Sequence, residues 1–106
     1  MKLIYIYHSC YAIEGDDYTI LIDFYKDQSD VKGRKIVQDI LLNRPGAFYV
    51  LSTHGHSDHF TPEVLSWKIN RPDIHYIFSK DILVDGKASA TDAVYLNKGE
   101  TYQDDL

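Results

Sequence analysis

The sequence lacks the features that mark disulfide-stabilised, fibrous and membrane proteins. Its 106 residues include one cysteine, Cys10, so no disulfide can form within the chain, and a reducing compartment is favoured. Six glycines and three prolines are too few for a collagen-like or low-complexity chain. No apolar run is long enough to span a bilayer, and no cleavage signal follows the apolar start, which is interrupted at His8. We therefore expect a cytoplasmic protein with no membrane partner.

Positive charge is also scarce. Eleven Lys and Arg face sixteen Asp and Glu, which gives a formal net charge of -5 at pH 7. Such a chain lacks the basic surface that draws proteins to a phosphate backbone, so we expect no nucleic-acid partner. The hydrophobic fraction of 44% and the charged fraction of 25% are those of an ordinary globular domain. We expect a single domain over residues 1–106.

Strand-like and helix-like segments alternate after an opening group of strands, which indicates an α/β fold with a mixed sheet and covering helices. The opening strands are expected to form an antiparallel meander. Apolar and β-branched runs predict strands at residues 3–8, 11–13, 18–23, 48–52, 74–78 and 93–96. One helix is expected between a cap at Ser29 and Asp30 and a stop at Pro45 and Gly46. A second is expected from Thr61 to about Asn70, with its buried side formed by Val64, Leu65 and Ile69.

A cluster of imidazole and carboxylate groups follows the buried strand at residues 48–52. A strand's carboxyl end is where open α/β sheets place their sites, so these side chains can converge there. Nitrogen and oxygen donors of this kind suit zinc or a similar dication, and Gly55 and Ser57 are small spacers that let the loop curl. The alternative is a polar surface loop with incidental histidines. The cluster consists of His54, His56, Asp58 and His59.

The segment from Thr53 to His59 resembles the HxHxDH signature of the metallo-β-lactamase fold superfamily. The stretches 8–13 and 20–23 are similar to the opening of its small hydrolases that include the ascorbate-phosphate lactonases. The resemblance implies an αβ/βα sandwich of which this chain is the amino-terminal half. It also implies that His54 and His56 ligate a first metal and that Asp58 and His59 ligate a second, with a bridging hydroxide as nucleophile. Asp58 is thereby expected to be catalytic as well as a ligand.

The activity that the resemblance implies is metal-dependent hydrolysis of a small-molecule ester, lactone or phosphoester, with one or two zinc ions, or manganese or iron in their place. In the family a third histidine, a bridging aspartate and a further histidine come from the second half of the fold. After His59 this sequence contains one histidine, His75, and it lies inside an expected strand. We therefore expect little turnover from this chain alone. We also expect an open sheet edge and apolar face, covered by a second copy or a complementing chain.

Three further residues are weaker candidates. Asp23 ends a strand and is expected to orient the metal loop by accepting its N–H bonds, or else to be a turn aspartate. His8 either projects toward the metal pocket or is a structural histidine at a strand end. Cys10 is expected to be a small core residue, because no Lys or Arg adjoins it to activate the thiol.

Two other functions stay open on the sequence. One is a non-catalytic fragment that binds a metal loosely and associates with another chain. The other keeps the superfamily but takes RNA as substrate, and the net charge of -5 counts against it.

Overall fold

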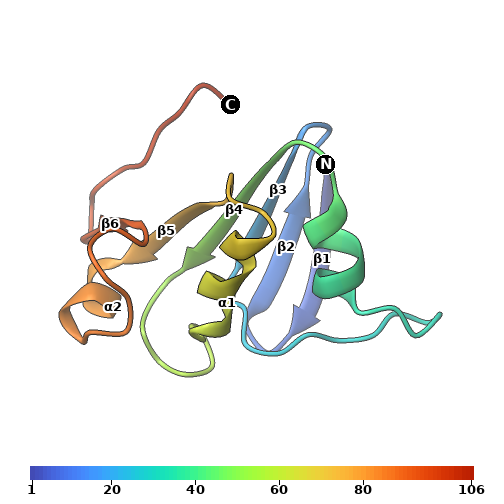
Figure 1. Cartoon of the computed structure of the whole chain (residues 1–106), viewed down its shortest axis with the longest axis horizontal. Helices are drawn as coiled ribbons and strands as arrows, with labels where there is room; N and C mark the ends of the chain where they lie inside the picture. Colours follow the sequence, from blue (N-terminus) through green and yellow to red (C-terminus); the bar gives the residue numbers. More distant parts are fainter.

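The computed structural model describes residues 1–106, which form one six-stranded mixed sheet in the order β1-β2-β3-β4-β5-β6. The first three strands pair antiparallel, and β3 to β6 pair parallel (Figure 1). The structure thus confirms the α/β class with antiparallel opening strands. The strands are β1 (Lys2–Tyr7), β2 (Cys10–Glu14), β3 (Tyr18–Ile22), β4 (Ala47–Ser52), β5 (His75–Ser79) and β6 (Val94–Leu96).

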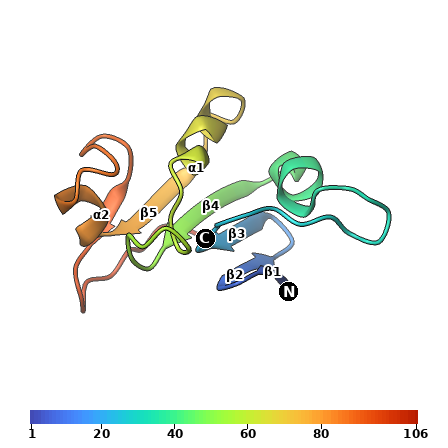
Figure 2. The ribbon, with the colours of Figure 1, turned by 90° about the horizontal axis from the view of Figure 1, so that it is seen from below.

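The helices cover one face of this sheet. α1 (Glu63–Ser66) and the helical turns η1 (Ile36–Ile40) and η2 (Leu41–Asn43) lie on the same side (Figure 2). The hydroxyl of Tyr76 in β5 donates a hydrogen bond to the Val64 carbonyl, which ties α1 to the sheet. Burial of this apolar layer is the main stabilising term of the fold. Its centre consists of fully buried side chains from strands and helices: Leu21, Val37, Leu41, Phe48, Val50, Val64, Phe78 and Ile82.

The opposite face of the sheet carries no helix. The registers place a second set of apolar side chains on it: Leu3, Tyr5, Tyr11, Ile13, Ile20, Tyr49, Leu51 and Ile77. At the β1 edge Leu3 is 64% and Tyr5 58% exposed. Over the centre, the extended segment after β6 lies close to the sheet, since the Tyr49 hydroxyl donates to Asp104 Oδ2 at 2.5 Å. This apolar face is therefore open at the β1–β2 edge, while the segment after β6 lies over its centre.

The first predicted helix is wrong over its first half. Asp30 does not cap a helix, because its Oδ1 accepts the N–H groups of Lys32 and Arg34 and closes a turn instead. Gly33, at φ +80°, completes that turn in a left-handed conformation that interrupts a right-handed helix. Helical structure begins only at η1, where the Asp27 carboxylate accepts the N–H groups of Val37 and Gln38.

The second predicted helix exists but differs in its buried side. α1 begins at Glu63, and no side chain caps it, so Thr61 is not the cap that we predicted. The chain tightens into the short 3-10 turn η3 (Trp67–Ile69), which places Trp67 against Phe24 with the ring centroids 4.9 Å apart. Ile69, predicted to be buried, is 82% exposed because the tighter winding turns it away from the sheet.

A short helix that the sequence did not predict follows β5. This helix, α2 (Lys80–Val84), buries Ile82 completely and returns the chain toward β6. Because β3, β4 and β5 run parallel, their carboxyl ends meet at one edge of the sheet. Asp23, the histidine loop and α2 all leave the sheet at that edge.

Candidate functional site

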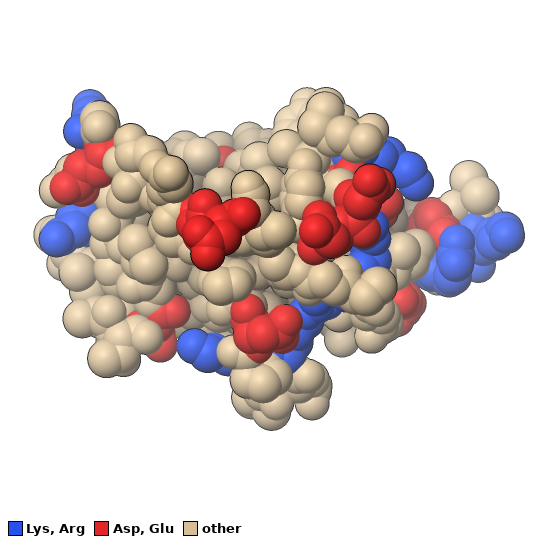
Figure 3. All heavy atoms as spheres, turned by 90° about the horizontal axis from the view of Figure 1, so that it is seen from above, with Lys and Arg blue, Asp and Glu red and all other residues tan.

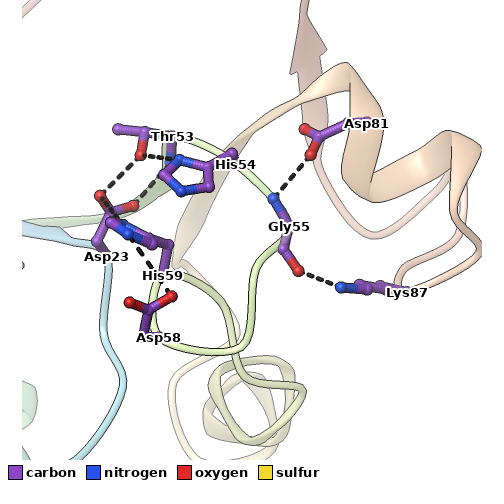
Figure 4. A network of polar contacts seen from close by, with 8 residues as sticks. All are labelled: Asp23, Thr53, His54, Gly55, Asp58, His59, Asp81 and Lys87. Carbon is purple, nitrogen blue, oxygen red and sulfur yellow. Dashed lines mark hydrogen bonds and ion pairs between the residues drawn. The ribbon is translucent and has the colours of Figure 1, made fainter.

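The histidine loop, residues 53–59, leaves the carboxyl end of β4 between the ends of β3 and β5 (Figure 4). The carbonyl of His56 accepts the N–H groups of His59 and Phe60, each at 2.9 Å, which curls the loop into a turn. The Phe60 ring is buried against Phe78 at a centroid distance of 5.2 Å. The loop is thus anchored in the core immediately after its last histidine.

Asp23 is the residue that binds this loop to the neighbouring strand end. Its side chain is buried, and its Oδ1 accepts the Thr53 N–H at 2.7 Å. Its Oδ2 accepts the Thr53 hydroxyl at 2.8 Å and contacts His59 Nδ1 at 3.0 Å. Asp23 has φ +55°, a left-handed conformation that aspartate tolerates better than most residues. One carboxylate therefore holds both ends of the histidine loop.

These bonds determine which ring nitrogens carry protons. A carboxylate only accepts hydrogen bonds, so His59 Nδ1 must donate to Asp23 and His59 Nε2 is left without a proton in the neutral ring. Thr53 gives its hydroxyl proton to Asp23, so His54 Nδ1, 3.0 Å from Thr53 Oγ1, must donate to that oxygen. In the neutral state of each ring, these bonds leave the Nε2 lone pair free, which is the state in which histidine binds a metal.

The candidate ligands lie close to one another. The centroid of the His54 ring lies 3.7 Å from that of His59 and 4.7 Å from that of His56. His59 Nε2 lies 3.6 Å from Asp58 Oδ1. Two ligands about 2.1 Å from one tetrahedral ion would lie about 3.4 Å apart, so this pair is spaced for a shared ion. No three such groups converge on one point, however, so the donors fit a dication in type and pairwise spacing but do not form a closed site.

Gly55, between His54 and His56, is buried and is bound from the other side by the α2 segment (Figure 4). Its N–H donates to Asp81 Oδ2 at 2.8 Å, and its carbonyl accepts from the Lys87 ammonium. The Ser79 hydroxyl hydrogen bond lowers the pKa of the Asp81 carboxyl, and the Gly55 N–H adds to this. Neither Asp81 nor Lys87 was a candidate in the sequence. Asp81 follows the strand predicted at residues 74–78, and the convergence of strand ends at one edge of an α/β sheet is the signal that could have identified it.

A family model described as a beta-lactamase superfamily domain matches residues 2–106. The chain belongs to this family. The match confirms the superfamily resemblance carried by the histidine loop and leaves the lactonase-like subgroup a prediction. No curated protein and no solved structure matches the chain.

Two other histidines of this beta-lactamase superfamily domain make no ring contact with the histidine loop. His8, at φ +52° after β1, packs edge-on against the rings of Tyr7 and Tyr25 and makes no ring contact with the loop histidines. His75 begins β5, at the opposite end of the parallel strands, and stacks on Tyr49 with centroids 4.9 Å apart. The structure therefore brings together His54, His56, Asp58, His59 and Asp23 and places His75 at the other end of the parallel strands. His8 follows β1 at the same edge of the sheet as the loop, but its ring packs on Tyr7 and Tyr25.

Cys10 is a core residue, as we predicted. The side chain is fully buried, and burial, followed by the carboxylates of Asp23 and Asp27, raises the pKa of its thiol to about 12. We expect the folded protein to resist iodoacetamide at pH 8, because the thiolate is the reactive form, and to be labelled fully in denaturant. Mass spectrometry measures both. Rapid labelling of the folded protein would contradict the burial of this thiol.

None of the helices has the length and apolar character needed to cross a membrane.

Proposed function

We propose that residues 1–106 form the amino-terminal half of a metallo-β-lactamase-type domain and supply metal ligands to a divalent-metal-dependent hydrolase, with zinc the expected ion. The observation that carries the proposal is the arrangement of two imidazoles. His59 contacts Asp23 directly, and His54 contacts it through Thr53. Each has its Nδ1 proton engaged, which leaves its Nε2 lone pair available. Membership of the beta-lactamase superfamily also supports a hydrolase.

In this proposal His54 and His56 hold one ion, and Asp58 and His59 hold a second. A bound dication would lower the pKa of a water molecule to about 7 and so would supply a nucleophile at neutral pH. Asp23 keeps the ring of His59 oriented and its proton on Nδ1, and Thr53 passes the same constraint to His54. Asp58, whose side chain is 48% exposed, is accessible to substrate as well as to metal. The expected substrate is a small ester, lactone or phosphoester. We expect the chain to belong to the lactonase-like subgroup and to act in the cytosol.

Charge favours a small substrate over RNA. The net charge is -5, and on the face seen in Figure 3 acidic side chains form separate groups on a largely uncharged surface with no broad basic area. A nuclease would instead need lysines and arginines along a strand of phosphates.

Native mass spectrometry and a substrate panel test the proposal. We expect bound zinc in the native protein and little turnover from the monomer. Hydrolysis of a lactone or a phosphodiester is expected in those chromatographic fractions in which another chain completes the site, and a chelator should abolish it. Bound zinc without turnover in any fraction would favour a non-catalytic metal-binding half-domain. Protein that takes up no zinc, or turnover that resists the chelator, would contradict the proposal.

A second chain is also part of the proposal. The open face presents Leu3, Tyr5 and Tyr11 to solvent, and β1 is an edge strand with one side unpaired. Large apolar patches and free strand edges drive association, so we expect a second copy, or a complementing chain, to cover this face.

Light scattering after size exclusion tests the homodimer directly. We expect the purified chain to elute with a mass near twice 12.2 kDa. Tyr5→Lys should shift it toward the monomer, because it places a charge at the centre of the apolar edge. Lys32→Glu, in the exposed turn after β3, is the control that should leave the mass unchanged. A clean wild-type monomer would exclude the homodimer.

A further inference from the structure

The histidine loop is held on its α2 side by two charged residues for which the proposed function has no role. Asp81 Oδ2 accepts the Gly55 N–H at 2.8 Å, and the Lys87 ammonium donates to the Gly55 carbonyl. Hydrogen bonds that involve a charged partner are roughly twice as strong as neutral ones. Both side chains belong to exposed residues, and the buried anchor of α2 is Ile82. Their contacts are therefore directed at the loop and are not part of the apolar core.

The two bonds act on different peptide units. The N–H belongs to the peptide between His54 and Gly55, and the carbonyl belongs to the peptide between Gly55 and His56. Fixing both planes fixes the backbone rotation at Gly55, the most permissive residue type. That rotation sets the angle between the two histidine side chains, whose ring centroids are 4.7 Å apart.

The segment that carries the two charges is itself rigidly placed. The Ser79 hydroxyl donates to the second oxygen of Asp81, and the Lys87 N–H donates to the Ile82 carbonyl at 3.0 Å. A methyl group at Gly55 would lie 3.2 Å from Asp81 Oδ2, closer than an ordinary van der Waals contact, so a side chain at this position would push the carboxylate away. The two charged side chains thus match the N–H and the carbonyl of Gly55, and the carboxylate fits closely against its Cα.

We propose that Asp81 and Lys87 are positioning residues that clamp Gly55 and so aim His54 and His56 at a common metal ion. This inference rests on the proposed metal-binding function. It assigns a role to α2 and the turn after it. This segment follows β5 and would hold the metal-binding loop that follows β4.

Zinc affinity, measured by competition with a chromophoric chelator, tests the clamp. We expect Asp81→Ala and Lys87→Met each to weaken zinc binding about tenfold or more, the size of effect typical of residues that orient metal ligands. Asp81→Asn and Lys87→Arg keep an acceptor and a donor, and they should recover most of the affinity. The matched controls are Lys80→Met in α2 and Asp85→Ala directly after it, which alter the same segment without touching the loop and should bind like wild type.

A second readout needs no metal. In the metal-free protein, the Gly55 amide should exchange its hydrogen faster in Asp81→Ala than in Asp85→Ala, because its acceptor is gone. Far-UV circular dichroism of each variant verifies the fold.

The outcomes separate the two proposals. Zinc binding that is lost in His56→Ala but unchanged in Asp81→Ala and Lys87→Met would overturn the clamp and leave the proposed function standing. Unchanged Gly55 exchange in Asp81→Ala would also overturn it. A wild-type protein without zinc affinity overturns the proposed function and, with it, the clamp.

Discussion

His54→Ala and His56→Ala are each expected to abolish tight zinc retention. In the proposed ligand set, His54 and His56 are the two ligands that this chain gives to the first ion, so the loss of one imidazole leaves that ion a single ligand from the chain. His75→Ala is the matched control, because His75 lies at the other end of the parallel strands and stacks on Tyr49. It removes the same side chain from the same chain without touching the loop.

Metal content after gel filtration, measured by elemental mass spectrometry, gives the result directly. We expect bound zinc in wild type and in His75→Ala and none in the two loop variants. Asp58→Asn keeps the shape of the side chain but not its charge, so a second ion should be lost before the first. Stoichiometric zinc retained in both His54→Ala and His56→Ala would remove these histidines from the ligand set.

The strands were predictable because each has a strong local signal. Residues 48–52 are apolar almost without interruption, and in the structure Phe48, Tyr49 and Val50 are all buried. The prediction of the first helix was wrong over its first half, and the reason is also physical. The periodic apolar positions from Val31 onward matched a helix, but the Asp30 turn and Gly33 made a loop of its first half and left Val31 fully exposed. A local hydrogen-bonded turn outweighed the hydrophobic period.

The part of the candidate site that could be predicted is the part whose residues are neighbours in the sequence. The four metal-binding candidates lie within six positions, and Asp23 was noticed because it ends a strand. Asp81 and Lys87 were missed because their partner, Gly55, is 26 and 32 residues away along the chain. No local pattern marks a charged side chain that binds a distant backbone group. Only the sheet order, with β5 beside β4, brings them together.

Asp23→Asn is expected to preserve the fold and to weaken zinc binding by about tenfold to a hundredfold. Asparagine tolerates the left-handed backbone of this position, at φ +55°, and its amide oxygen can still accept the Thr53 N–H. Its NH₂ group, however, takes the place of Oδ2, the oxygen that faces His59. A group that accepted a hydrogen bond is replaced by one that donates.

His59 must respond by changing tautomer. Its Nδ1 has to accept from the new amide, so the ring proton moves to Nε2, which can then no longer offer a lone pair to a metal. Nitrogen NMR of the imidazole should show Nδ1–H in wild type and Nε2–H in the variant. Asp27→Asn is the control, because the Asp27 carboxylate binds the N–H groups of Val37 and Gln38, outside the histidine loop. It should weaken the fold slightly and leave the zinc affinity unchanged.

The paired readouts separate an orienting role for Asp23 from a merely structural one. If Asp23 served only to close a turn after β3, Asp23→Asn would lower the melting temperature but leave both the tautomer of His59 and the zinc affinity as in wild type. If it sets the tautomer, the zinc affinity falls while the unfolding transition stays cooperative. Because Thr53 connects the same carboxylate to His54, the ring proton of His54 should also become less firmly held on Nδ1. A single carboxylate then controls two imidazoles that lie five residues apart in the loop.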